Sequence, residues 1–215
     1  IKIKKFIKNK KIKIYDTFPS TTFQRNLGLK KVKNSKYVLF LDDDIKLKKK
    51  SFYHMNNGII KYRNFKNICS YAFNLKSDKN KFKNEKLKVN FFTEFVGLYS
   101  SKPGKVLKSG WHTKISNLNR DTVVEWIYSG ATIFVLNKIK KMKFENLNKG
   151  FNYLEDLHFS YRLTKKKMKH IVIAKATVNN PNFIDRNDIS FGYIEIINRY
   201  KFVNKFNLSK VLFYL

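Results

Sequence analysis

The sequence predicts a single α/β domain in which helices flank a mostly parallel central sheet. Strand-like and helix-like segments alternate along the chain, as they do in βαβ units. The run at 37–41 is apolar throughout, which is typical of a strand buried on both faces of a parallel sheet. Hydrophobic residues make up 43% of the 215 positions, so one domain of this kind can bury a substantial core.

The first half of the chain opens with residues 11–15, where alternating Lys and Ile predict a strand. Pro19 and Ser20 then supply a turn and a helix N-cap. Further along, Met55 and Ile59 recur at the spacing of one helix face. The predicted elements of this half are strands at 11–15, 37–41 and 67–73 and helices at about 23–32 and 51–62.

The second half begins with a Lys-, Asn- and Asp-rich segment at 76–90, which predicts a surface loop. Residues 91–122 are irregular, with a turn at Pro103 and Gly104. Regular patterns then resume, and the last helix is amphipathic. The predicted elements are strands at 123–126, 131–136 and 171–174 and helices at about 154–164 and 191–206.

The charge balance is extreme, because 46 basic residues face 15 acidic ones and leave a net charge of +31. Such a charge attracts nucleic acid, anionic lipid or a phosphate-bearing substrate. An AT-rich genome would also enrich Lys, Asn, Ile and Phe, and the lysines are scattered along the whole chain. Charge alone therefore does not identify a partner.

Composition also bears on location. No apolar run approaches the roughly 20 residues that cross a bilayer, and the N-terminus lacks the apolar region of a secretory signal. The single Cys69 excludes an internal disulfide framework and favours a reducing compartment. We therefore expect a cytoplasmic protein. The missing initiator Met and the apolar last residues suggest that residues 1–215 form one domain truncated at both ends.

Three consecutive carboxylates, Asp42, Asp43 and Asp44, directly follow the apolar run at 37–41. Ligands of α/β sheets gather beyond the carboxyl ends of the strands, and a sharp turn there would let Asp42 and Asp44 converge on one ligand. Because three adjacent like charges repel, a divalent cation that carries a phosphorylated ligand would relieve them. Hard oxygen ligands favour Mn²⁺ or Mg²⁺. A solvated acidic turn is the alternative interpretation.

A second acidic pair, Glu155 and Asp156, opens the helix predicted at 154–164. Acids are common in the first turn of a helix because the helix dipole stabilises them. Metal-assisted transfer to a hydroxyl also needs a separate carboxylate that accepts the proton. The pair therefore has both a structural and a catalytic interpretation.

Other polar groups complete the candidates. Arg25 and Asn26 precede the acidic strand and could hold a diphosphate or a base. Trp126 could belong to the core or form a platform for a sugar, since it lies three residues before Ser129 and Gly130. The four histidines lack metal-ligand spacing, and no Gly-rich phosphate loop or Gly-x-Ser-x-Gly elbow is present, which argues against zinc, Walker-type and serine-hydrolase sites.

Four segments in this order resemble family 2 glycosyltransferases of the Rossmann-like GT-A fold. They are Gln-Arg-Asn-Leu-Gly at 24–28, the apolar run with its acids at 37–44, Trp-Ile-Tyr-Ser-Gly at 126–130, and 150–162 with Tyr-Leu-Glu-Asp and Phe-Ser-Tyr-Arg. The likeness covers roughly residues 10–180. The acidic motif alone is permissive, and its combination with a Gly and a Glu-Asp pair about 110 residues later is more specific.

The resemblance implies a role for each matching residue. Asp42 and Asp44 match the Asp-x-Asp motif, with Asp44 the metal ligand and Asp42 a ligand that also lies near the nucleotide ribose. Asp156 matches the catalytic base of inverting members, and Glu155 is its acidic neighbour. The implied nucleotide- or substrate-binding residues are Arg25, Asn26, Asp42, Asp43, Trp126, Ser129 and Gly130. The implied reaction is a single displacement at the anomeric carbon of a nucleotide-diphosphate sugar, aided by Mn²⁺ or Mg²⁺.

The sequence also departs from the family pattern. His158 stands where members often carry another acid, and the Gln-x-x-Arg-Trp motif of processive synthases is absent, so we expect transfer of single sugars. The usual first strand has no counterpart, because residues 1–8 look like the tail of the following helix. We therefore expect a nucleotide pocket that lacks one wall.

The expected partners are a nucleotide-sugar donor and a glycan or lipid-linked acceptor, with peripheral association at the inner face of an anionic membrane as a further hypothesis. Two rival functions use the same features. A metal-dependent nucleotidyltransferase would employ the same acids, and a carboxylate pair could hydrolyse glycosidic bonds. A basic nucleic-acid-binding module is the non-enzymatic alternative, but the three acids would repel phosphate without a metal, so no nucleic acid is expected.

Overall fold

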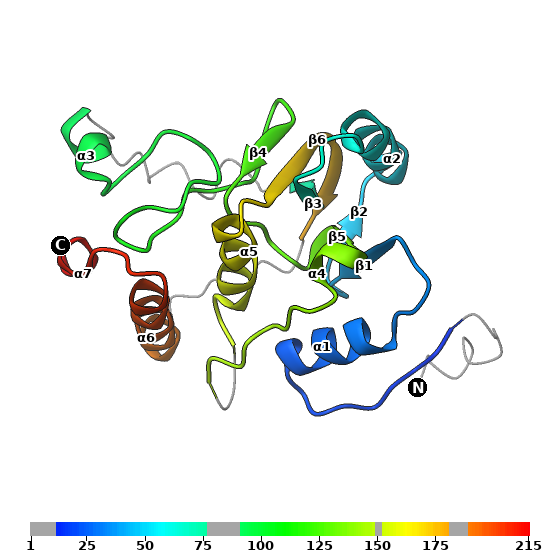
Figure 1. Cartoon of the computed structure of the whole chain (residues 1–215), viewed down its shortest axis with the longest axis horizontal. Helices are drawn as coiled ribbons and strands as arrows, with labels where there is room; N and C mark the ends of the chain where they lie inside the picture. The colour runs from blue at the N-terminus through cyan, green and yellow to red at the C-terminus, as the bar shows by residue number, and fades with distance from the viewer. Residues whose placement is uncertain (1–11, 77–90, 149–151, 181–188) are drawn as a thin grey trace.

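A sheet of six strands carries helices on both of its faces (Figure 1). This computed structural model describes residues 12–76, 91–148, 152–180 and 189–215. The strands are β1 (Tyr37–Leu41), β2 (Lys46–Leu47), β3 (Ile68–Leu75), β4 (Thr122–Val124), β5 (Ala131–Val135) and β6 (Lys169–Asn179). The helices are α1 (Thr21–Lys31), α2 (Ser51–Tyr62), α3 (Phe91–Val96), α4 (Leu136–Ile139), α5 (Glu155–Lys165), α6 (Ile189–Lys205) and α7 (Lys210–Tyr214).

The sheet is mixed, so the prediction of a mostly parallel sheet is wrong. Its order is β1-β5-β3-β6-β2, with β4 also paired to β6. Only β3 and β6 are parallel neighbours among these pairs, and β5 is antiparallel to both β1 and β3. Because β5 is antiparallel to both β1 and β3, these two strands run in the same direction, and β6 is parallel to β3. Their carboxyl ends therefore lie at one edge of the sheet, where ligands were expected.

The strand at 37–41 contacts a core on both faces but is only partly buried, which corrects the expectation of full burial. Strand β1 is the outer strand on its side of the described sheet, and Leu41 is 42% exposed while Val38 is buried. The doubly buried strand is β3, whose first seven residues are all buried. Val38 and Phe40 pack with the core on one face, and Tyr37 and Leu39 pack with the core on the other. Because an outer strand has a neighbouring strand on one side alone, most of these side chains stay partly exposed.

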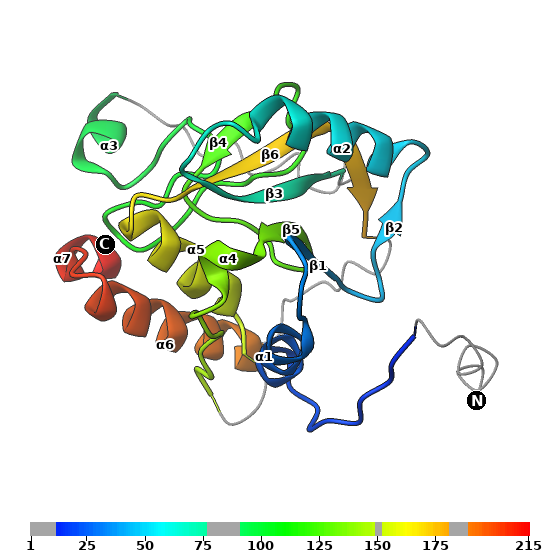
Figure 2. The same cartoon turned by 45° about the vertical axis from the view of Figure 1, so that its right-hand side comes forward.

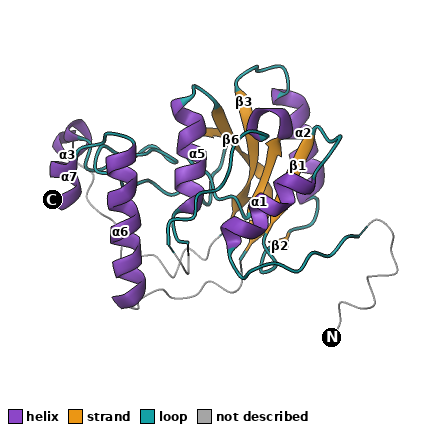
Figure 3. Cartoon of the chain, turned by 60° about the horizontal axis from the view of Figure 1, so that its bottom comes forward, coloured by secondary structure: helices purple, strands orange, loops and turns teal. Residues whose placement is uncertain are grey.

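Each face of the sheet contributes to a separate core. On one face, Tyr71 of β3 and Ile173 of β6 pack against Met55 of α2. On the other face, Phe134 of β5 and Val172 of β6 pack with Phe159 and other residues of α5. The period of two residues along β3 and β6 sends alternate side chains to the two cores. Figure 3 shows the resulting order α2, sheet, α5 and α6 across the molecule.

Helix α6 lies outside α5 and does not touch the sheet core. Leu157 and Tyr161 of α5 form a third cluster with Phe202 of α6. Beyond it, α3 and α7 lie at the same end of the molecule (Figure 2). Within the described ranges, no helix combines the length and the apolar character that a membrane crossing requires.

Most predicted elements exist, with two clear errors. Residues 12–15 of the strand expected at 11–15 have no regular structure. Their Ile side chains are exposed, and their backbone pairs with no strand in the described chain. The segment 91–122, expected to be irregular, contains α3. Cys69 is fully buried in β3. The loop predicted at 76–90 falls, apart from residue 76, outside the described residues, as do residues 1–8 and Gly150.

Two buried histidines contribute to the polar interior. Nε2 of His170 lies 2.9 Å from the carbonyl oxygen of Ser160, and its Nδ1 lies 2.7 Å from Oγ of Ser70. A carbonyl only accepts, so Nε2 carries the proton and Nδ1 accepts from the Ser70 hydroxyl. His158 lies between α5 and α6, with Nε2 3.3 Å from the carbonyl oxygen of Asn198. Burial lowers the pKa of both rings, so both are neutral near pH 7.

We expect the folded state to lose stability between pH 6.5 and pH 5. Burial lowers the pKa of both His158 and His170 to about 4, whereas an unfolded histidine titrates near 6.5. The unfolded chain therefore binds protons in this window that the folded chain does not, and stability falls as the pH falls. The free energy of unfolding from urea titrations should drop by roughly 2 kcal/mol per histidine between these pH values. Glu155, whose pKa is raised by burial, works in the opposite direction in this window, so the same titrations are made on His170→Gln. The variant should lose less stability than wild type as the pH falls, and an equal loss would contradict the neutral assignment of His170.

Candidate functional site

A single guanidinium, carried by α1, joins three acids that come from two other elements of the fold. Nη1 of Arg25 lies 2.9 Å from Oε1 of Glu155 and 2.8 Å from Oδ1 of Asp156. Its Nη2 lies 3.2 Å from Oδ1 of Asp42. These four residues, the Arg25 group, come from α1, the end of β1 and the start of α5. The structure thus brings together acids that are more than 110 residues apart in the sequence.

Local structure explains why these side chains meet. Ser20 caps α1, accepting from the backbone N–H of Phe23, and the helix then presents Arg25 on its buried side. At the other end, Leu154 adopts the left-handed conformation with a φ of 71° and turns the chain into α5. Glu155 and Asp156 therefore occupy the first helical turn, where the helix dipole favours negative charge.

Asp42 is held by three neighbours although its side chain is 30% exposed. Its Oδ2 accepts from the Tyr128 hydroxyl at 3.0 Å and lies 3.4 Å from Nη2 of Arg25, and its backbone N–H donates to the carbonyl of Gly130 at 2.8 Å. A Cβ on Gly130 would stand 2.0 Å from Oδ2 of Asp42, so only glycine leaves room for this carboxylate. The Ser129-Gly130 turn expected beside the donor sugar therefore packs directly against the acidic motif.

Burial and charge shift the pKa values of the group in different directions. Desolvation and then the charge of Asp156 raise the pKa of Glu155, although Arg25 acts against this. Burial opposes the charged form of Arg25, but the attraction of Asp156, Glu155 and Asp42 prevails and raises its pKa. Burial and the charge of Asp42 raise the pKa of the Tyr128 hydroxyl, which stays a donor. With all three acids ionised, the Arg25 group would retain two negative charges.

Asp44 differs from Asp42 because one of its oxygens is unused. Oδ2 of Asp44 accepts from Nδ2 of Asn180 at 2.9 Å, just beyond the carboxyl end of β6. Its Oδ1 is buried and has no hydrogen-bond partner among the described residues. A buried carboxylate oxygen without a partner is costly, and a cation would satisfy it. Asp43, between the two, points outward and is exposed.

These observations test whether a divalent cation fits. Among the described residues, no three His, Cys, Asp or Glu side chains form a ready-made metal cluster. Mg²⁺ is commonly held by one or two carboxylates together with substrate phosphates, so a complete protein cage is not required. The free Oδ1 of Asp44 suits that smaller ligand set.

The remaining predicted residues lie in different surroundings. Both polar atoms of the Asn26 side chain bond to the backbone of Phe144. Nδ2 donates to the carbonyl oxygen of Phe144 and Oδ1 accepts from its N–H, both at 2.8 Å. The Ser129 hydroxyl is buried and has no partner in the described chain. Nε1 of Trp126 donates to the carbonyl of Thr113 at 2.9 Å, and its ring lies against His112 with centroids 4.2 Å apart.

Sequence reasoning missed two contributors to this site. Tyr128 lies within the segment that carries the resemblance, and its position two residues before Gly130 is the signal in the sequence that indicates it. Asn180 carried no local signal. It reaches Asp44 because β1 and β6 end at the same edge of the sheet, and that placement depends on strand order.

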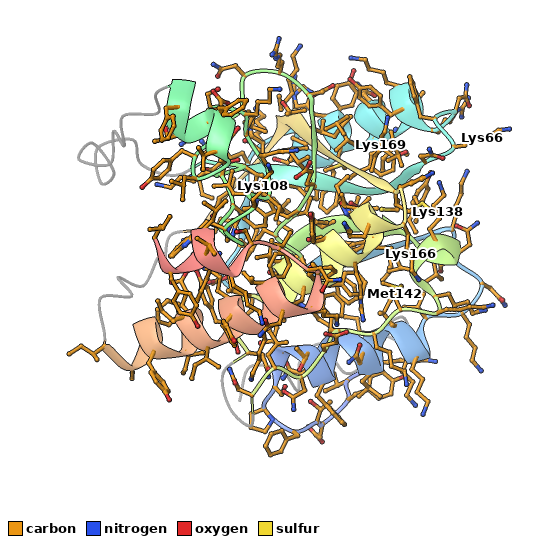
Figure 4. All side chains as sticks on the ribbon, turned by 60° about the vertical axis from the view of Figure 1, so that its left-hand side comes forward. Lys66, Lys108, Lys138, Met142, Lys166 and Lys169 are labelled. Carbon is orange, nitrogen blue, oxygen red and sulfur yellow. The ribbon has the colours of Figure 1, made fainter. Side chains whose placement is uncertain are left out.

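A cavity of about 500 Å³ lies at the opposite end of the sheet. Its lining includes Asn67, Lys167 and Lys169, which precede or open β3 and β6, and it contains no member of the Arg25 group. Figure 4 labels Lys169 beside the sheet, and places Lys66, Lys138 and Lys166 together on one side of the view. This basic end of the molecule is separate from the acidic end.

Comparison with known proteins adds no identification. No family model and no curated protein sequence matches this chain. The functional proposal below therefore rests on the residues and their geometry.

Proposed function

We propose that this chain is an inverting glycosyltransferase with a GT-A-like fold, which moves one sugar from a nucleotide-diphosphate sugar to an acceptor hydroxyl. The observation that carries this proposal is the convergence of Asp42 and Asp156 on one buried guanidinium, Arg25. Sugar transfer needs a carboxylate near the leaving diphosphate and another near the incoming hydroxyl. Resemblance in four segments of the sequence supports the same function.

In the proposed reaction, Asp156 accepts the proton of the acceptor hydroxyl as that oxygen attacks the anomeric carbon. The bond from the anomeric carbon to the diphosphate oxygen breaks on the opposite side, so the configuration inverts. Asp44, together with Asp42, would hold Mn²⁺ or Mg²⁺ beside the diphosphate. When bound, such a cation offsets the negative charge on the leaving group. Burial of the Arg25 group strengthens these electrostatic contacts.

The proposal extends to partners and place of action. The acceptor would be a glycan or a lipid-linked hydroxyl, and the protein would act in the cytoplasm, with the basic surface drawn to the inner face of an anionic membrane. Nucleic acid is not part of the proposal. The acids of the site would repel its phosphates in the absence of a metal ion.

The direct test is a screen of nucleotide-sugar donors with Mn²⁺ or Mg²⁺ and simple glycoside or lipid-linked acceptors, followed by product analysis. Transfer of sugar with release of a nucleoside diphosphate supports the proposal. Transfer of a nucleotide with release of pyrophosphate would instead identify a nucleotidyltransferase, and cleavage of glycosides without metal or nucleotide would identify a hydrolase.

We expect Asp44→Asn to weaken binding of Mn²⁺ by at least about tenfold, because it replaces the carboxylate that has the free oxygen. Isothermal titration of Mn²⁺ in the presence of a nucleoside diphosphate measures this without turnover. Glu145→Gln is the matched control, since Glu145 pairs with Arg162 and Lys205 away from the site, and its Mn²⁺ affinity should stay within about twofold. Equal effects of the two variants would contradict the assignment of Asp44.

A further inference from the structure

We propose that Arg25 is a positioning residue for this transfer, which holds Asp156 in a fixed place relative to Asp42, and that it is not a ligand of the nucleotide. This inference rests on the proposed function. It differs from the role that the sequence resemblance implies, in which Arg25 lies against the nucleotide. The difference follows from how the guanidinium is used in the structure.

Both terminal nitrogens of Arg25 contact carboxylates of the protein. Nη1 contacts both acids at the start of α5, at 2.9 Å to Glu155 and 2.8 Å to Asp156, and Nη2 contacts both oxygens of Asp42. The two contacts of Nη1 use both of its N–H groups, whereas the two oxygens of Asp42 share one N–H of Nη2. The side chain is only 6% exposed, which leaves a ligand little access to the remaining N–H groups. A nucleotide phosphate could reach Nη1 only by displacing a carboxylate.

The backbone that carries Arg25 is also fixed. The next residue, Asn26, makes two hydrogen bonds of 2.8 Å to the backbone of Phe144. The ring of Phe144 lies 5.4 Å from the guanidinium carbon of Arg25 and stacks on Phe159 of α5 with centroids 3.9 Å apart. Helix α1 is thereby docked against α5. The guanidinium is therefore pre-organised between the two carboxylates that the reaction would use.

The planar fork of the guanidinium matters as well as its charge. Two terminal nitrogens that diverge from one carbon can reach Glu155 and Asp156 on one side and Asp42 on the other. A lysine would bring the same charge as a single ammonium on a flexible stem, and could not hold both sides with the same geometry. Replacement of the Arg25 guanidinium by a lysine ammonium should therefore leave Asp156 without a fixed position, although the positive charge is retained.

The experiment compares wild type with Arg25→Lys and Arg25→Ala, using the donor and acceptor found in the screen. For Arg25→Lys we expect kcat to fall about 100-fold, the effect of a misplaced catalytic group, while the donor KM stays within about threefold. Ethylguanidinium in the assay should restore at least about tenfold of the kcat lost in Arg25→Ala. Arg162→Met is the matched control: Arg162 lies on α5 but pairs with Glu145, outside the Arg25 group, and its kcat should match wild type.

Nucleoside diphosphate binding measured by titration calorimetry gives the second readout, because it does not depend on turnover. Affinity within about threefold of wild type in both Arg25 variants supports the inference. A rise in donor KM and a matching loss of nucleoside diphosphate affinity, with kcat unchanged, would show that Arg25 binds the nucleotide and overturn it. A wild-type chain that turns over no donor would instead remove the proposed function and this inference together.

Discussion

Replacement of Asp156 with asparagine is expected to reduce sugar transfer by about 10²–10⁴-fold, the range that a general base contributes. Asparagine has nearly the same shape and can still accept a hydrogen bond from Nη1 of Arg25. It cannot take the proton of the acceptor hydroxyl. The loss should therefore appear in kcat, with the donor KM little changed, in initial-rate measurements of released nucleoside diphosphate.

Glu145→Gln is the matched control for this variant. Glu145 pairs with Arg162 and Lys205, away from the Arg25 group, so its replacement removes one carboxylate without touching the site. Its kcat should stay within about twofold of wild type. Full activity in Asp156→Asn would mean that another group accepts the proton, which would contradict the assignment of Asp156 as the general base.

Gly130→Ala is expected to disrupt both the site and the fold around it. The new Cβ would stand 2.0 Å from Oδ2 and 2.5 Å from Cγ of Asp42, so the carboxylate would have to leave its contacts with Tyr128 and Arg25. Overpacking of this kind costs about 1–3 kcal/mol. Urea titration should show that loss of stability. Activity should fall by about 100-fold or more because the acids lose their shared arrangement.

Gly192→Ala is expected to give the opposite result. Gly192 lies within α6, and among the residues that the structure describes a Cβ there would meet nothing within 4 Å. Alanine should stabilise the helix by about 0.5–1 kcal/mol, since glycine loses more backbone freedom on folding. Equal stability of the two alanine variants would contradict the close packing of Gly130 on Asp42.

Most residues of the candidate site could be predicted from the sequence, because they form clusters of acidic side chains in a chain with few acids. Three acids after an apolar strand and a Glu-Asp pair at a helix start are rare in a chain with 15 acidic residues, and both sets proved to lie near Arg25. The partner of each residue was not predictable in the same way. Whether Arg25 and Asn26 face a nucleotide or the protein depends on how α1 docks, which is a tertiary property.

The fold was predictable at the level of elements and wrong at the level of strand direction. The bounds of β1 and α2 match the sequence pattern, because each has a clear apolar signal between turns. The alternation at 11–15 failed because period-two hydrophobicity needs a sheet to bury one face. The reversal of β5 could not be deduced, since an apolar run has no direction.

The ion pairs of Arg25 also have a consequence for folding kinetics. They join residues 130 and 131 positions apart, so the chain must close a very long loop before the acids are neutralised. Contacts between such distant segments form slowly. The free-energy cost of desolvating the charges is offset only when all of the ion pairs have formed. During refolding, secondary structure should therefore recover before catalytic competence does.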